Sequence, residues 1–209
     1  MMARAAGRHG ELFMKYVRMF LFFAGLFFSA AASASAAGAF GVELGTDIGR
    51  YMHSPEPVSE RQELRMYEIT PPSPDARFDT YAVDTFRGTV IRIMASSPDD
   101  ATAEGTKTLE VFESLKDELI ARYGTPSLCL EEVEDAGNEL RGYLADEGGL
   151  EVLEWNFAVA GKDADTPGAV YVFLAGSEKE NGEQASYCTL YMESADYPAI
   201  SDQAERDKQ

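Results

Sequence analysis

Basic residues are scarce in this chain. Its 209 residues include 18 Lys and Arg against 36 Asp and Glu, which gives a formal net charge of −18 at neutral pH. So acidic a chain repels the phosphate backbone of nucleic acids and the surface of anionic membranes, because both are bound through Lys and Arg. We therefore expect no nucleic-acid partner. Two explanations of the acidity remain open: it provides solubility, or it attracts a basic partner, since complementary charge accelerates association.

Histidine and cysteine are almost absent, and this limits the available chemistry. The chain has two histidines and two cysteines, whereas hydrolytic triads need a histidine base and zinc sites need three or four converging ligands. After residue 40 the one histidine is His53, which we interpret as an exposed residue beside the loop "SPEP". Phosphate-binding glycine loops and dinucleotide fingerprints are missing too. The sequence therefore predicts a protein that is not an enzyme and carries no metal or other cofactor.

Long apolar runs are missing as well. The run from Met19 to Phe28 has about ten residues, half of the roughly twenty that a transmembrane helix needs. Basic residues precede this run and small residues follow it, which is the pattern of a cleavable signal peptide. We predict a signal peptide over residues 1–36, with Met14 as an alternative translation start. The segment has no cysteine to carry a lipid, so we expect no stable membrane anchor.

Export would determine the compartment, the charge and the state of the cysteines. Residues 1–36 carry a net charge of +3, and subtracting this from −18 leaves −21 for the remainder. We expect a periplasmic or secreted protein in an oxidising environment. Cys129 and Cys188 are then predicted to form a disulfide that links the first and last strands of the second half of the chain. The alternative is two separate buried thiols, because free cysteine packs like a small apolar residue.

One helix is predicted clearly, over residues 107–123. Apolar residues recur there at steps of three and four, which places an apolar stripe along one side of the helix. The stripe consists of Leu109, Phe112, Leu115, Leu119 and Tyr123. Glu118 and Arg122 have the spacing of an ion pair on the outer side. Gly124 and Pro126 then end the helix.

Segments rich in β-branched and aromatic residues predict strands. They are residues 40–45, 63–69, 78–86, 88–96, 127–133, 150–159, 169–176 and 186–193, with one or two helical turns at 46–52. The expected fold class is α+β: an antiparallel sheet covered on one face by one main helix, in two similar halves that each run from a helix into strands. Residues 38–194 would form a single domain, and 195–209 a flexible polar tail. Arg92 indicates that one sheet face is partly wet.

Three stretches resemble known proteins: "FGVELGTDIGRY", "YEITPPSPDARFDTYAVDTFRGTVIRIMA" and "FESLKDELIARYGTP". They are similar to a loose group of small exported bacterial proteins of unknown function. The order of helix and strands, twice over, also resembles the fold of the β-lactamase inhibitory protein and of small outer-membrane assembly lipoproteins. This chain lacks the lipid-anchoring cysteine of those lipoproteins. The resemblance assigns no functional residue to a numbered position.

The sequence supports two hypotheses about function. The first is an exported, non-catalytic, strongly acidic protein that binds another protein, in the manner of an inhibitor, with a basic envelope protein as the partner. The second is a periplasmic module that binds a small ligand in a pocket lined by the aromatic residues of its sheet. A concave apolar pocket with a few convergent polar groups would favour the second.

Overall fold

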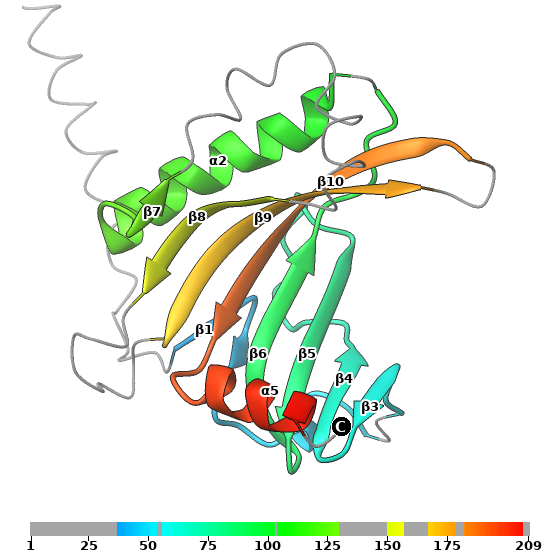
Figure 1. Ribbon diagram of the computed structural model, residues 1–209, viewed down its shortest axis with the longest axis vertical. Coiled ribbons are helices and arrows are strands. Elements are labelled where there is room, and N and C mark those ends of the chain that lie inside the picture. Colours follow the sequence, from blue (N-terminus) through cyan, green and yellow to red (C-terminus); the bar gives the residue numbers. More distant parts are fainter. Residues whose placement is uncertain are drawn as a thin grey trace, which may run out of the picture. The chain divides into compact units, whose positions relative to one another are not determined.

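The computed structural model describes residues 37–53, 56–102, 104–129, 150–156, 167–178 and 182–206. Their strands are β1 (Gly38–Ala39), β2 (Val42–Glu43), β3 (Ser59–Arg61), β4 (Leu64–Glu68), β5 (Thr80–Phe86), β6 (Thr89–Ser96), β7 (Leu128–Cys129), β8 (Leu150–Asn156), β9 (Ala169–Glu178) and β10 (Gln184–Glu193). Their helices are the 3-10 helix η1 (Ile48–Arg50), α2 (Thr106–Tyr123) and α5 (Tyr197–Arg206) (Figure 1). The predicted signal peptide lies outside the described residues. Within them, no helix is long and apolar enough to cross a membrane.

Strands β3 to β10 form one antiparallel sheet in the order β3-β4-β5-β6-β10-β9-β8-β7. The order consists of two four-stranded meanders, β3 to β6 and β7 to β10, which meet because their last strands, β6 and β10, pair. A helix precedes each meander, η1 in the first half and α2 in the second. The structure thus confirms the predicted α+β class, the antiparallel sheet with one main helix, and the two halves that run from helix into strands.

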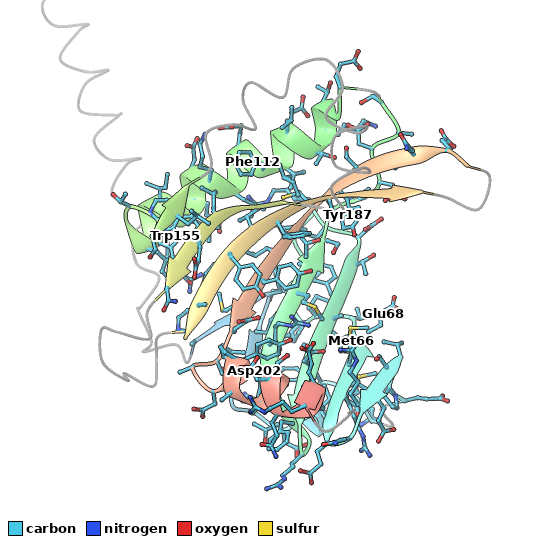
Figure 2. The ribbon with its side chains drawn as sticks, viewed as in Figure 1. Met66, Glu68, Phe112, Trp155, Tyr187 and Asp202 are labelled. Atoms are coloured by element: carbon cyan, nitrogen blue, oxygen red, sulfur yellow. The ribbon has the colours of Figure 1, made fainter. Side chains whose placement is uncertain are left out.

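Helix α2 covers one face of the sheet, which we call the core face. Its buried residues are Thr108, Phe112, Leu115 and Leu119, and the last three belong to the predicted stripe. They join a core cluster that includes Trp155, whose indole Nε1 donates to the Gly124 carbonyl at 2.8 Å (Figure 2). The helix ends at Gly124, whose φ of 80° is accessible to glycine at little cost. The helix prediction is confirmed to within one residue.

The two predicted hairpin strands, β5 and β6, are also confirmed. Arg87 and Gly88 connect them with positive φ angles of 54° and 82°, the conformation that matches the twist of a two-residue hairpin. Further upstream, the predicted strand at 40–45 is instead a small hairpin of β1 and β2, and the strand at 63–69 is shorter and pairs with the unpredicted β3. Strands β1 and β3 were not predicted, because a strand of two or three residues is too short to show an alternating pattern.

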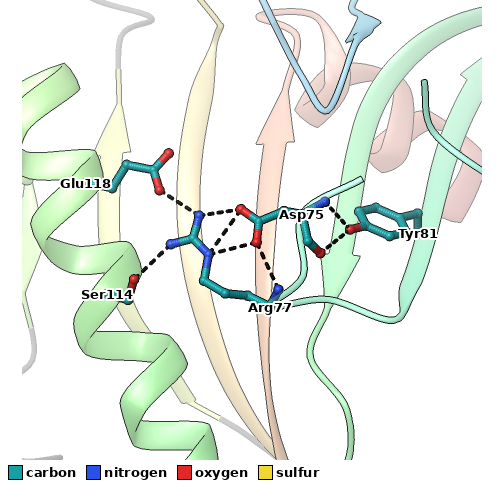
Figure 3. A network of polar contacts seen from close by, with 5 residues as sticks. All are labelled: Asp75, Arg77, Tyr81, Ser114 and Glu118. Carbon is teal, nitrogen blue, oxygen red and sulfur yellow. Dashed lines mark hydrogen bonds and ion pairs between the residues drawn. The ribbon is translucent and has the colours of Figure 1, made fainter. Parts of the chain in front are cut away.

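Helix α2 is held at both ends by charged residues from the preceding loops, Asp100 at its start and Arg77 towards its end. Asp100 accepts from the Lys107 backbone N–H at 2.7 Å and from Thr102. Burial of Asp100 tends to raise its pKa, but these hydrogen bonds stabilise the charged form more strongly, so the net effect is a lowered pKa. Towards the other end, Arg77 donates to Glu118 at 2.6 Å and to Asp75 at 2.6 Å (Figure 3). Glu118 therefore contacts Arg77, which corrects the predicted pairing of Glu118 with Arg122.

The predicted flexible tail at 195–209 is wrong for residues 197–206, which form helix α5. Tyr197 and Ala204, two turns apart on one side of α5, are buried. The Tyr197 hydroxyl donates to Asp84 at 3.2 Å, which fixes the helix to the sheet face opposite α2. Only a few apolar residues mark α5 in the sequence, which is why this helix was not predicted. Residues 207–209 lie outside the described part.

The predicted disulfide between Cys129 and Cys188 is contradicted by the strand order. Strands β8 and β9 lie between β7, which contains Cys129, and β10, which contains Cys188. The register pairs Cys129 with Leu153, Leu153 with Val172 and Val172 with Leu190. Three strand spacings amount to about 14 Å, whereas a disulfide needs Cα atoms roughly 4.4 to 6.8 Å apart. Cys188 is a free, buried cysteine.

Thiol labelling tests this correction. Burial raises the pKa of the Cys188 thiol to about 12, so the unreactive thiol form persists at neutral pH. We expect Cys188 to resist a thiol reagent in the native protein. After unfolding without reductant, both Cys129 and Cys188 should react. If neither reacts until a reductant is added, the two cysteines are bridged and the strand order is wrong.

Candidate functional site

The candidate site is the sheet face opposite α2, which we call the open face. Side chains alternate between the two faces of a strand, so the register aligns open-face residues into rows across the sheet. One row, the ionic row, contains Glu193, Arg92 and Asp84 on adjacent strands β10, β6 and β5. The next, the aromatic row, contains Tyr171, Tyr191 and Met94 on β9, β10 and β6. These rows combine residues that are far apart in the sequence.

The ionic row is a compact cluster around one guanidinium. Arg92 donates to Asp84 at 2.6 Å and lies 3.7 Å from the Glu193 carboxylate. Its guanidinium also lies over the ring of Tyr197 from α5, 4.4 Å from the centroid, and near Tyr191 at 5.4 Å. The Arg92 side chain keeps only 20% of its exposure. Arg92 is therefore less exposed to solvent than the sequence predicted for a charged residue, because two carboxylates and two aromatic rings enclose its guanidinium.

Burial changes the acidity of the groups around Arg92. It raises the pKa of Glu193, although a hydrogen bond from the Tyr171 hydroxyl at 2.5 Å and the charge of Arg92 act in the opposite direction. It also raises the pKa of Tyr171 and of Tyr197, so both phenols stay protonated as donors. Burial disfavours the charge of Arg92, but the surrounding negative groups, Asp84 first, raise its pKa. The cluster is thus a charge-compensated support for the aromatic row beside it.

The aromatic row presents partly exposed rings. Tyr171 and Tyr191 stack with centroids 4.8 Å apart and ring planes at 17°. Phe173 lies two residues after Tyr171 on β9, and its ring meets the Tyr191 ring edge-on with the centroids 6.5 Å apart. All three rings retain partial exposure. Partly exposed, mutually fixed aromatic rings on a sheet are typical of protein interfaces, since they offer large apolar area with few torsions to restrict.

An acidic groove continues the open face beyond the aromatic row. It has a volume of about 420 Å³ and is lined by Asp79, Thr80, Ser96, Ser97, Asp99 and Tyr187. Thr80 and Ser96 pair across β5 and β6, and Ser96 also bonds to Thr189 of β10 at 2.9 Å. Tyr187 of β10, which is labelled in Figure 2, contributes an aromatic ring to the lining of this groove. The groove gives the open face a negative end.

His53 lies away from the open face's rings and acidic groove. It is exposed, as predicted, and lines a shallow depression of about 490 Å³ with Tyr51 and Glu68 among its neighbours. Met52, Ile69 and Thr70 complete the lining of that depression. Aromatic residues are a minority in the lining of the His53 depression, of the acidic groove and of the cavity beside Arg92 and Tyr197.

The comparisons with known proteins add no relative. No family model matches the chain, and neither the curated proteins nor the solved structures contain a match.

The sequence indicated only part of the open face. In β9 and β10, aromatic residues alternate with aliphatic ones, so both faces are apolar, and this two-sided pattern indicates that the face away from α2 is also used. The ionic row carried no such signal.

Proposed function

We propose that the protein is an exported, non-catalytic binding protein that holds a basic protein partner against its open face. The observation that carries this proposal is the combination, on one face, of partly exposed aromatic rings with the acidic groove. Rings provide apolar contact area, and the acidic groove selects for positive charge.

Rigidity supports the same proposal. Tyr171 is fixed by its hydrogen bond to Glu193 and by its stack on Tyr191, and Tyr191 in turn lies against Arg92. Rings that are already ordered lose little conformational entropy on binding, so more of the contact energy appears as affinity. The partner's basic groups would meet Asp79 and Asp99 in the groove while an apolar surface covers the rings.

Affinity capture with matched variants tests the proposal. The tagged protein would be incubated with an extract of its own cell envelope, and the bound proteins would be eluted with increasing salt. We compare Phe173→Ser and Tyr187→Ser with Ile120→Ser, which changes an apolar side chain on α2 that is 40% exposed but lies on the core-face side. Far-ultraviolet circular dichroism verifies that each variant is folded.

The proposal predicts a specific pattern of retention. A partner retained by wild type and by Ile120→Ser should be reduced roughly thirtyfold in affinity by each open-face variant, as for an interface hot spot. It should also elute early in the salt gradient, because salt screens the attraction between exposed charges. Equal retention by all variants, or a partner that is acidic, would contradict the assignment of the open face.

A further inference from the structure

A small cavity of about 170 Å³ lies between α5 and the end of the ionic row. The register places Ser59 beside Met66 and Met66 beside Asp84, so β3, β4 and β5 extend the row beneath α5. Figure 2 marks β4 at Met66 and α5 at Asp202, and the two elements are in contact. The residues around the cavity are Ser59, Arg61, Leu64, Met66, Asp84, Arg92, Tyr197 and Ser201.

Arg61 differs from the other arginines of the sheet. It forms no ion pair with any residue that the structure describes, although acidic residues outnumber basic ones twofold in the chain. Two nearby arginines do form ion pairs: Arg65 on β4 pairs with Glu60, and Arg87 in the turn between β5 and β6 pairs with Glu63. An unpaired guanidinium beside a cavity offers five N–H donors in a planar fork, the geometry that carboxylates match.

A second guanidinium leaves a donor unused on the same side. Arg92 Nε is buried without a hydrogen-bond partner among the described atoms, which is uncommon for a buried donor. Asp84, the one carboxylate in the lining, is already engaged by Arg92 at 2.6 Å and by the Tyr197 hydroxyl at 3.2 Å. The local excess of positive charge is therefore at Arg61, whereas Leu64 and Met66 give the cavity an apolar wall.

We propose that this cavity binds a small aliphatic carboxylate, with the carboxylate on Arg61 and the carbon chain against Leu64 and Met66. The volume is below the range of about 300 to 1,000 Å³ for drug-sized ligands, so it suits a chain of a few carbons. A single unpaired guanidinium in a strongly acidic chain favours one negative charge over two. The site lies beside the ionic row, apart from the aromatic row, and does not depend on the proposed protein partner.

Titration of butyrate into the purified protein tests the site, with amide chemical shifts as the readout and chloride to hold the ionic strength constant. Butanol, butylammonium and sulfate, at the same concentrations, serve as the neutral, cationic and inorganic-anion controls. Two variants are compared: Arg61→Gln, and Arg65→Gln as a matched control on the next strand, whose guanidinium faces Glu60. Arg61 is exposed at the sheet edge, so its replacement leaves the fold intact.

We expect saturable shifts centred on the amides of β3, β4 and α5. Arg61→Gln should weaken butyrate binding about tenfold or more, since hydrogen bonds between charged groups are the strong ones, and Arg65→Gln should change it less than twofold. Butanol binding as tightly as butyrate would overturn the role of Arg61. Equal binding of sulfate would overturn the preference for a carboxylate, and an unchanged affinity in Arg61→Gln, or no saturable shift, would overturn the site itself.

Discussion

Replacement of Arg92 by glutamine should lower the free energy of unfolding by about 3 kcal/mol or more at pH 8. The substitution leaves Asp84 and Glu193, both less than a tenth exposed, without their cation. Removing one partner of a buried ion pair typically costs about 3 to 5 kcal/mol, because the remaining charge stays desolvated and uncompensated. Urea unfolding followed by the fluorescence of Trp155, the one tryptophan of the chain, measures the change.

The pH dependence of this variant provides a second readout. Burial already raises the pKa of Glu193 in the wild type, and loss of the Arg92 charge raises it further. A carboxyl with a raised pKa in the folded state contributes stability below its unfolded pKa and loses that contribution as pH rises through the folded pKa. The deficit of Arg92→Gln should therefore be smaller at pH 5 than at pH 8.

A matched control separates the cluster from arginine pairs in general. Arg65→Gln removes the same group from an ion pair with Glu60 in which both side chains are 48% exposed. Exposed pairs contribute less than about 1 kcal/mol. Equal losses in Arg65→Gln and Arg92→Gln would show that the Arg92 cluster is not a buried one.

Replacement of Trp155 by alanine is expected to have a similarly large effect. The indole is 2% exposed, lies in the core under α2 and donates to the Gly124 carbonyl at the end of that helix. Large-to-small changes of buried aromatic residues typically cost about 3 to 5 kcal/mol, from lost apolar contact and the cavity left behind. Thermal unfolding followed by far-ultraviolet circular dichroism measures it without the tryptophan signal.

Ile120→Ala is the control for Trp155→Ala. Ile120 lies on the outer side of α2 and is 40% exposed, and alanine favours the helix. We expect a change within about 0.5 kcal/mol, as for surface positions in general. If Trp155→Ala unfolds no earlier than Ile120→Ala, helix α2 does not pack on Trp155 as described.

The sequence predicted those elements whose formation depends on residues close together in the chain. The stripe through Phe112, Leu115 and Leu119 identified α2, and the turn at Arg87-Gly88 identified the hairpin of β5 and β6. Such signals lie within a few residues of each other, so they can be recognised before any strand partner is known.

Features that depend on strand order could not be predicted. Asp84, Arg92 and Glu193 meet only because β6 pairs with both β5 and β10. Strands β9 and β8 separate Cys188 on β10 from Cys129 on β7, and the alternation of residues along each strand could not reveal this order. Helix α5 was missed for a related reason: Tyr197 is anchored by Asp84, a partner that only the folded sheet supplies.

Site-specific photo-crosslinking in cells tests the central claim, that the open face is the binding surface. A photoreactive amino acid would replace Phe173 or Tyr187 on the open face, or Glu110 or Ile120 on the exposed side of α2. The proposal predicts the same discrete crosslinked protein from both open-face positions and none from the two α2 positions. Crosslinks that arise from α2 alone, or equally from all four positions, would contradict it.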